Sequence, residues 1–342
     1  MNTPRTAVVI LNWNGRAYLQ AFLPSVVGHS PKEVRIIVAD NASSDDSLDF
    51  LKKNYPGIRI IALSQNLGYA GGYNAALEQL DADYFVLLNS DMEVTSGWIE
   101  PVITLMESDA SIAACQPAIR AYHHKTHFEY AGASGGFLDR YGYPFCRGRI
   151  FNTLEPDQGQ YPDARDVFWA TGACLFVRAV AFRETGGFDS RFFAHMEEID
   201  LCWRMKNKGY RIMVCPGSTV YHVGGGTLPK SSSRKTYLNF RNSLWLMAKN
   251  MPRGAFYGSL LFRKMLDAMA ALKFLLSGHP ADCFAVIKAY RAFLLSYRTM
   301  RSHSPKAGSG LPSLMYRRSI AWDYFLRKRK TFTMLDPEKF VH

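Results

Sequence analysis

The sequence predicts an α/β protein with a mostly parallel central sheet flanked by helices, followed by a mainly helical C-terminal extension. Three observations predict it: short apolar runs alternate with amphipathic stretches in the first half, polar residues follow each run, and the basic last third has apolar residues at helical spacing. Of the 342 residues, 48% are hydrophobic and 20% charged, which is enough to bury a large core. A globally disordered chain and a small disulfide-stapled scaffold are therefore excluded.

Four short runs rich in β-branched or aromatic residues are predicted to be buried strands. They are Ala7 to Leu11, Val34 to Ala39, Ile58 to Leu63 and Tyr84 to Leu88. Between them, apolar residues recur at three- and four-residue steps, which predicts helices packed on a sheet. These helices span Arg16 to Val27, Ser47 to Asn54 and Gly71 to Leu80. The alternation favours parallel pairing, so a ligand is expected beyond the carboxyl ends of the strands.

Polar residues follow each predicted strand in turn. They are Asn12 and Asn14 after the first, Asp40 and Asn41 after the second, Asn66 after the third, and Asn89 and Asp91 after the fourth. Because the carboxyl ends of parallel strands meet at one edge of a sheet, we expect these side chains to converge on one crevice. Ordinary turn residues are the alternative for any one of them, but explain four sets in succession less well.

Two of these strings suggest how a nucleotide is held. The string DNASSDDS begins with Asp40, whose carboxylate can accept a hydrogen bond from a ribose hydroxyl or a base N–H. In NLGYAGGYN, glycines that include Gly71 lie around a predicted helix start, where small residues let a pyrophosphate or a sugar approach the backbone. The string has neither the spacing of the dinucleotide fingerprint nor the lysine of a P-loop.

An oxygen-rich cluster, Asn89, Ser90 and Asp91, closes the fourth strand. It suits a hard divalent cation that also binds diphosphate oxygens, and an Asx turn is the alternative. Further along, His222 lies between the apolar run 213–220 and three glycines. It is a candidate metal ligand or a candidate hydrogen-bond donor to a phosphate, although a lone histidine more often has a structural role.

Three acids, Glu197, Glu198 and Asp200, lie together at the start of a predicted helical stretch. The positive end of the helix dipole offsets the repulsion between the three carboxylates. A carboxylate close to other carboxylates has a raised pKa, which helps it act as a base. The alternative is a solvated acidic first turn.

Charge is divided unevenly along the chain. Residues 1–229 carry 20 basic and 24 acidic groups, a net of −4, whereas residues 230–342 carry 21 and 5, a net of +16. We therefore expect an α/β domain over 1–229 and a basic, mainly helical extension over 230–342. The extension should meet an anionic partner such as a membrane surface, a phosphate-bearing lipid or a nucleic acid, unless its charges only solvate helix faces.

Two stretches of the extension, Phe256 to Leu276 and Ala281 to Leu295, have the pattern of amphipathic helices with basic polar faces. Such helices suit a membrane interface, but packing on the first domain is an equal alternative. Arg317, Arg318 and the run Arg327 to Lys330 would attract anionic lipid headgroups or an acceptor diphosphate. The segment 302–313, rich in Ser, Gly and Pro, is predicted to be a loop.

The sequence shows neither an export signal nor an obvious membrane-spanning segment. The N-terminal apolar run is too short for an export signal, and no stretch of about 18 uncharged apolar residues occurs. The six cysteines stand far apart and are expected to be buried thiols in a reducing compartment. A cytosolic location is therefore expected.

The succession of VVILNWNG, VADNASSDDS, NLGYAGGYN, LLNSDM, GACLFVR, GGFDSRFFAHMEEIDLCWR and VYHVGGGT resembles family 2 glycosyltransferases over residues 5–245. The resemblance is strongest to the rhamnosyltransferase-like branch that acts on bacterial surface polysaccharides. It implies a GT-A fold, a nucleotide-diphosphate sugar donor, a Mg²⁺ or Mn²⁺ ion, and inverting transfer by a single displacement.

The resemblance also implies roles for individual residues on the donor side. Asp40 resembles the acid that holds the nucleoside, and the other donor-side residues would be Asn12, Asn14, Asn66, Gly71 and Asn89. Asp91 matches the metal-binding aspartate of a DXD-type motif, and His222 resembles a histidine that completes the metal site. The first acid of that motif is replaced here by Asn89.

For the acceptor side, the family's general base is usually an aspartate, and the matching position is Glu198. Glu197 and Asp200 would shape its electrostatic field. Trp169, Thr171 and Gly172 fall where the family has walls of the acceptor site, and Trp169 is expected to stack on a sugar face.

The implied function is transfer of a sugar, such as rhamnose, to a lipid-linked or polysaccharide acceptor at the inner face of the bacterial plasma membrane. A sugar nucleotidyltransferase is one alternative, but the loop after the first strand lacks the triphosphate-binding Gly and Arg or Lys residues. A non-catalytic glycan- or nucleic-acid-binding protein is another. No nucleic acid is expected, because the aromatic residues of the extension have helical spacing and form no stacking platform. A homodimer through the C-terminal helices is also conceivable.

Overall fold

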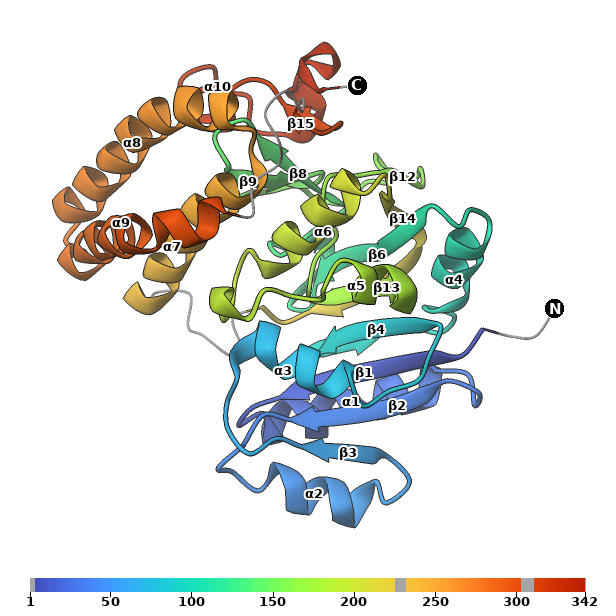
Figure 1. Cartoon of the computed structure of the whole chain (residues 1–342). Coiled ribbons are helices and arrows are strands. Elements are labelled where there is room, and N and C mark those ends of the chain that lie inside the picture. The colour runs from blue at the N-terminus through green and yellow to red at the C-terminus, as the bar shows by residue number, and fades with distance from the viewer. Residues whose placement is uncertain (1–3, 225–231, 303–310, 342) are drawn as a thin grey trace.

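A ten-stranded mixed sheet lies at the centre of residues 4–224, 232–302 and 311–341, which the computed structural model describes (Figure 1). Its order is β12-β14-β6-β13-β4-β1-β2-β3, with β5 paired to β14 and β7 paired to β6. The predicted fold class is confirmed, with a sheet that is parallel in its N-terminal part and mixed beyond β4.

The N-terminal part contains the predicted strand–helix alternation. Its strands are β1 (Thr6–Asn12), β2 (Arg35–Asp40), β3 (Arg59–Ala62) and β4 (Tyr84–Asn89), and its helices are α1 (Arg16–His29), α2 (Ser47–Asn54) and α3 (Gly68–Leu77). Helix α3 begins and ends three residues before the prediction. The backbone N–H groups of Tyr69 and Ala70 donate to the carbonyl of Phe193, so a distant loop fixes where this helix starts.

The second part of the sheet brings later segments to the same edge. It consists of β5 (Met92–Val94), β6 (Ile112–Ala121), β7 (His124–Phe128), β12 (Arg165–Asp166), β13 (Cys174–Arg178) and β14 (Arg211–His222), with helices α4 (Glu100–Glu107), α5 (Ala179–Glu184), η1 (Ser190–Phe192) and α6 (Glu197–Asn207). Strand β13 runs antiparallel between β4 and β6, so its first residues lie beside the carboxyl end of β4.

The hydrophobic core has one part on each face of the sheet because side chains alternate along each strand. In β1, Ala7 and Val9 face the cluster that includes α3, α5 and α6. Val8 and Ile10 face the cluster that includes α1, α2 and α4. The sheet is thus covered by helices on both faces and its polar strand ends meet at an edge.

A smaller five-stranded sheet, in the order β11-β10-β9-β8-β15, joins the C-terminal segment to the middle of the chain. It comprises β8 (Gly136–Asp139), β9 (Pro144–Cys146), β10 (Arg149–Ile150), β11 (Thr153–Leu154) and β15 (Met315–Tyr316). The extension adds helices α7 (Ser233–Asn250), α8 (Arg253–Leu276), α9 (Pro280–Arg301), α10 (Ile320–Phe325), η2 (Phe332–Met334) and η3 (Pro337–Lys339).

The predicted boundary between residues 229 and 230, and residues 303–310 of the predicted loop, lie outside the described residues. Within the described residues, no helix combines the length and the hydropathy needed to span a bilayer.

Candidate active site

Asn12 and Asp40 end adjacent parallel strands and are direct partners in the β1–β2 register. The Asn12 side-chain amide donates to Asp40 Oδ1 (3.0 Å) and to Ser43 Oγ (3.1 Å), and the Ser43 backbone N–H donates to Asp40 Oδ2 (2.9 Å). Asn14 accepts from the Ser44 N–H at 2.7 Å. Asp40 is buried, so in this structure it organises the loop, and its direct contact with a nucleoside stays a prediction.

Asn66 lies beside this network through Asn41. The Asn41 amide donates to Asn66 Oδ1 (3.1 Å) and to the Gly68 carbonyl (3.0 Å), and Asn41 Oδ1 accepts from the Leu67 N–H. Gly71 lies inside α3, where an added Cβ would come within 2.9 Å of the Leu67 side chain. This glycine permits close packing at the start of the helix.

Asp91 and His222 are brought together by the pairing of β5 with β14. His222 Nε2 lies 3.2 Å from Asp91 Oδ1, and His222 Nδ1 lies 3.1 Å from Glu129 Oε2. All three side chains are buried. Burial alone would lower the pKa of His222, but the two carboxylates outweigh it and raise the pKa to about 10, whereas the pKa values of Asp91 and Glu129 are lowered by the histidine despite their burial.

The donor set of Asp91 and His222 fits a divalent ion that completes its coordination with substrate oxygens and water. Asp91 Oδ1 faces His222 Nε2, which would bind an ion after the ring loses its proton, and Glu129 Oε2 lies beside the opposite ring nitrogen, where metal-binding histidines have their outer partners. Among the described residues, no three His, Cys, Asp or Glu side chains could hold an ion by themselves. An ion at Asp91 and His222 would therefore take its remaining ligands from substrate or water.

Glu197 and Glu198 occupy the first turn of α6. Burial and the neighbouring Glu198 hold the pKa of Glu197 well above its usual value, and burial raises the pKa of Glu198 to about 7. Within the described residues, Oε2 of each glutamate is buried without a hydrogen-bond partner. Burial thus favours the protonated form of both side chains, and does so more strongly for Glu197 than for Glu198.

Tyr69 connects this acidic pair with the end of β4. Burial and nearby groups that include both glutamates raise the pKa of Tyr69, and its hydroxyl donates to the Gly172 carbonyl at 2.7 Å. The carbonyl of the next residue, Ala173, accepts from the backbone N–H of Asn89 at 2.9 Å. Gly172 thus lies between the acidic pair and the Asn89–Asp91 segment.

Asp200 points away from this arrangement into an ion-pair cluster of its own. Its carboxylate accepts from Arg204 Nε (2.8 Å), from Lys249 Nζ (2.8 Å) and from the Asn250 amide (2.8 Å). These partners lower the pKa of Asp200 although it is fully buried. Asp200 fixes α6 against α7, and its predicted influence on the field at Glu198 is offset by two cations.

The loop before α6 has an unusual backbone. Phe193, His195 and Met196 have positive φ values of 66°, 70° and 72°, a conformation that costs free energy in residues other than glycine. The Asn242 amide, on α7, donates to the carbonyls of Phe192, Ala194 and His195 at 2.9, 2.9 and 2.7 Å. Helix α7 therefore holds the loop that sets the position of the two glutamates.

The sequence of this chain matches a known protein family. Residues 7–182, more than half of the chain, match the model described as Glycosyl transferase family 2. The chain belongs to glycosyltransferase family 2. This glycosyltransferase is 28% identical over 290 residues to an N-acetylglucosaminyl-diphospho-decaprenol L-rhamnosyltransferase of Mycobacterium tuberculosis, covering 78% of this chain and 94% of the relative. It is 23% identical to the O-antigen biosynthesis protein RfbC of Myxococcus xanthus, over 73% of this chain and 20% of the relative.

Solved structures of similar fold place the chain among GT-A proteins. Staphylococcus aureus TarS 1-349 in complex with UDP-GlcNAc has a TM-score of 0.54 at 14% identity, covering 87% of this chain and 90% of TarS. GalNAc-T7 with UDP, GalNAc and Mn²⁺ has a TM-score of 0.53 at 17% identity, covering 64% of this chain and 43% of the other. The predicted GT-A fold of this glycosyltransferase is confirmed.

The predicted acceptor wall of this glycosyltransferase is mostly buried. Trp169 is 3% exposed, donates its indole N–H to the Phe137 carbonyl at 2.9 Å, and packs on Gly136, whose added Cβ would come within 2.1 Å of the ring. An indole in this position offers almost no face to a sugar. Thr171 is also buried, with its backbone N–H bonded to Gln116 Oε1. The Gly172 carbonyl accepts from the Tyr69 hydroxyl.

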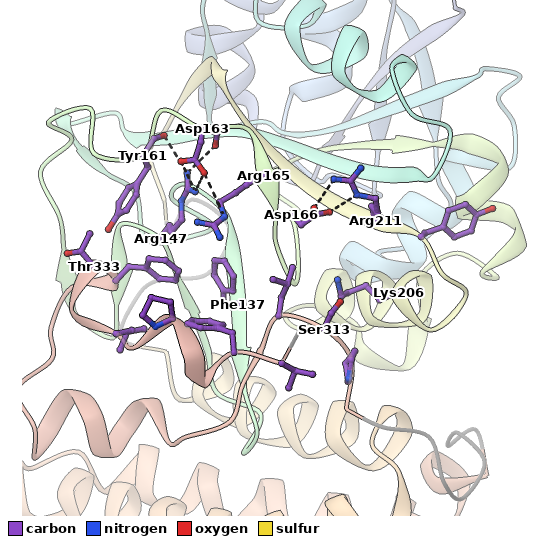
Figure 2. A pocket seen from close by; sticks show the side chains of 18 of the residues that line it. Phe137, Arg147, Tyr161, Asp163, Arg165, Asp166, Lys206, Arg211, Ser313 and Thr333 are labelled. Carbon is purple, nitrogen blue, oxygen red and sulfur yellow. Dashed lines mark hydrogen bonds and ion pairs between the residues drawn. The ribbon is translucent and has the colours of Figure 1, made fainter.

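A pocket of about 840 Å³ lies elsewhere, between β12, the end of α6 and the C-terminal segment (Figure 2). Figure 2 shows Arg147 directed at Asp163 and Arg211 directed at Asp166, with ion-pair distances of 3.1 and 2.7 Å. None of the predicted site residues lines this pocket. It is therefore separate from the candidate active site.

Sequence reasoning missed Glu129, Tyr69 and Asn242. Glu129 is an isolated acid far from every motif, and only the strand pairing brings it to His222. Tyr69 lies inside the string NLGYAGGYN, where the glycines took precedence in the prediction. Asn242 gives a weak signal. Its neighbours at steps of three and four residues include Leu238, Trp245 and Leu246, and a polar side chain on such an apolar helix face indicates a buried hydrogen-bond donor.

Proposed function

We propose that this glycosyltransferase transfers a sugar from a nucleotide-diphosphate donor to a lipid-linked acceptor of cell-envelope glycan synthesis, with inversion at the transferred carbon. The buried pair Glu197 and Glu198 carries the proposal, because a carboxyl group with a pKa of about 7 is suited to general-base work at neutral pH.

The similarity to the mycobacterial enzyme supports rhamnose as the sugar and a polyprenyl-diphosphate glycan as the acceptor, since both are in that relative's name. An acceptor carried on a polyprenyl chain stays in the bilayer. We therefore propose that the enzyme works at the inner face of the bacterial plasma membrane as a peripheral protein, with its basic extension in contact with lipid.

In the proposed reaction, Glu198 removes the proton from an acceptor hydroxyl as its oxygen attacks the anomeric carbon of the donor. The bond from that carbon to the diphosphate oxygen breaks on the opposite side, and the nucleoside diphosphate leaves with the bonding electron pair. Attack and departure on opposite faces invert the configuration. Glu197, protonated, keeps the second negative charge out of the pair while Glu198 is ionised.

The leaving group needs stabilisation because it gains negative charge. Asp91 and His222 would hold the Mg²⁺ or Mn²⁺ ion, which when bound neutralises charge on the diphosphate. Glu129 keeps the His222 ring oriented for this role. On the nucleoside side, Asn12, Asn14, Asp40 and Asn66 shape the strand-end loops that would surround the donor.

The variant Glu198→Gln tests the assignment of the base. It should lower the turnover number by at least about a thousandfold, because the amide cannot take up the proton, while the Kd for the donor changes less than about threefold. Turnover and donor binding are measured on the same full-length preparation. Turnover near that of the wild type would move the base to another residue.

The released product separates the enzyme classes. A glycosyltransferase releases a nucleoside diphosphate, whereas a sugar nucleotidyltransferase exchanges pyrophosphate. Chromatography of the nucleotide products after reaction with a polyprenyl-diphosphate N-acetylglucosamine acceptor should show nucleoside diphosphate in proportion to glycan formed. Pyrophosphate as the product would reject the transfer.

A further inference from the structure

Helices α8 and α9 form a hairpin at one end of the molecule (Figure 1). On the outer face of this hairpin, large apolar side chains of both helices are exposed. They are Tyr257, Leu261, Met265, Met269, Leu272, Leu275 and Leu276 of α8, and Phe284, Ile287, Leu294 and Leu295 of α9. The exposed fractions range from 45% for Met265 to 81% for Leu295. Steps of three and four residues put the α8 members on one helix face. A cluster of this size marks a contact surface.

The inner face of the hairpin is fixed to the rest of the protein, so the apolar face cannot turn inward. Arg263 and Asp267 are buried and paired at 2.8 Å. The hydroxyls of Tyr143 and Tyr290 donate to Asp267, and Arg263 donates to the Ser243 hydroxyl. A buried ion pair with all its partners is costly to break, which holds the hairpin in one orientation.

Charge on the hairpin identifies what covers this face. Between residues 253 and 301 the exposed charged side chains are all cationic. They are Arg253, Lys264, Lys273, Lys288, Arg291 and Arg298. The two acids of the segment are occupied within the protein, since Asp267 is buried and Asp282 accepts from the Thr236 hydroxyl at 2.6 Å. An apolar face bordered by cations alone complements an anionic lipid surface.

We infer that the outer face of the α8–α9 hairpin lies in the headgroup region of an anionic bilayer. A second copy of the chain fits this face poorly, because a symmetric contact would bring two sets of six cations together without an exposed acid between them. The role of this contact, which is to bring the site to a lipid-linked acceptor, rests on the proposed function.

Helix α10 extends the same surface. Lys273 Nζ lies 5.6 Å from the centre of the Phe325 ring, which places α10 beside the last turn of α8. Trp322, Phe325 and Leu326 are exposed by 44%, 47% and 60%, and the basic run 327–330 follows them. Tryptophan and basic residues are enriched where proteins meet lipid headgroups.

The hairpin is also connected to the acidic pair. Helix α7 packs against α9 on one side and against α6 on the other. The same helix carries Asn242, which holds the loop before Glu197. A protein docked through α8 and α9 would therefore hold its catalytic pair at a defined height above the lipid.

Co-sedimentation of the full-length protein with vesicles tests the inference. The wild type should pellet with phosphatidylcholine vesicles that contain about 30% phosphatidylglycerol, release in about 0.5 M salt, and bind pure phosphatidylcholine much less. A variant with Leu261→Ser, Leu272→Ser, Leu276→Ser and Leu295→Ser should bind the anionic vesicles at least about tenfold more weakly.

The matched control replaces exposed apolar residues outside the hairpin. Val27→Ser with Val180→Ser changes side chains that are 42% and 50% exposed and should leave vesicle binding unchanged. Thermal melting of each variant by circular dichroism shows that it is folded. Glu198→Gln should bind vesicles like the wild type, so a failure of the catalytic proposal is seen separately from a failure of docking.

Three outcomes would overturn the inference. The wild type fails to pellet with anionic vesicles, or the four-serine variant pellets as well as the wild type. The third is a stable dimer in sedimentation equilibrium that the four-serine variant dissociates, which would assign the apolar face to a second copy of the chain.

Discussion

Two adjacent glutamates with different protonation behaviour are the centre of the proposed chemistry. Glu197 is held neutral by burial and by its neighbour, whereas Glu198 loses its proton near pH 7. Coupled carboxyl groups titrate as a pair, so one proton leaves well before the other. In the proposed site, Glu198 is therefore the base and Glu197 is the neutral neighbour, because two adjacent buried carboxylates would repel each other if both were ionised.

The pH dependence of transfer follows from this pair. A base works only when it is deprotonated, so kcat/KM should rise about tenfold per pH unit below pH 7 and level off above it. Steady-state rates between about pH 5 and 9 at saturating Mn²⁺ measure this acid limb. A rate that is flat through pH 7 would contradict the assignment of Glu198.

Glu197→Gln is the matched comparison, because glutamine resembles a protonated glutamate in shape and charge. We expect it to lower the turnover number by less than about tenfold and to leave the acid limb near pH 7. If Glu197→Gln abolishes transfer and Glu198→Gln does not, the two roles are exchanged.

The sequence identified these residues as candidates, but it did not predict their surroundings. Glu198, Asp91 and His222 stood out through their positions after predicted strands or at a helix start. Trp169 could not be placed, because its burial depends on packing against Gly136, which is far away in the chain. Asp200 likewise pairs with Lys249, a contact between elements that periodicity does not reveal.

At the scale of elements, α7 and α6 act as a unit. Asn242 satisfies three carbonyls of the positive-φ loop, and Lys249 satisfies the carboxylates of Asp189 and Asp200 at 2.7 and 2.8 Å. The first set of bonds fixes where α6 begins. The second fixes the rest of that helix.

Asn242→Ala should reduce the turnover number by about tenfold to a hundredfold with little change in donor affinity. The loop before Glu197 loses three donated bonds and can relax from its costly backbone conformation, which displaces the base from the acceptor. Turnover and donor Kd are compared with Asn239→Ala, a less buried asparagine of the same helix. Equal effects of the two variants would contradict a positioning role.

Lys249→Met should lower the free energy of unfolding by about 3 kcal/mol at pH 7, because the buried carboxylate of Asp200 and the partly buried carboxylate of Asp189 lose a shared cation. The pKa values of Asp189 and Asp200 are depressed in the folded protein, so their stabilisation is present above the unfolded pKa and is lost as pH falls. Urea denaturation should therefore show a smaller difference between variant and wild type at about pH 3 than at pH 7.

The exposed Lys52→Met on α2 is the control for that measurement and should change stability by less than about 0.5 kcal/mol. A Lys249→Met variant as stable as the wild type at pH 7 would show that the cluster contributes nothing to folding.

For the whole molecule, the sequence predicted the first half better than the second. The four N-terminal strands were predicted because each is a short apolar run and each is followed by a polar loop. The insertion of β13 between β4 and β6, and the pairing of β15 with β8, join segments far apart in the chain and leave no periodic signal. The helical extension was predicted from amphipathic spacing, whereas its outward apolar face required the structure.

In the proposed site, segments from the whole chain come together, with Asp91 and His222 at the diphosphate and Glu198 at the acceptor. A crystal structure with Mn²⁺ and the nucleoside diphosphate that binds best among UDP, GDP and dTDP tests it most directly. We expect one anomalous peak in contact with Asp91 and His222, the nucleoside beside Asp40, and Glu198 facing the free end of the diphosphate. An ion and a nucleotide bound elsewhere, with Asp91 and His222 still paired to each other, would contradict it.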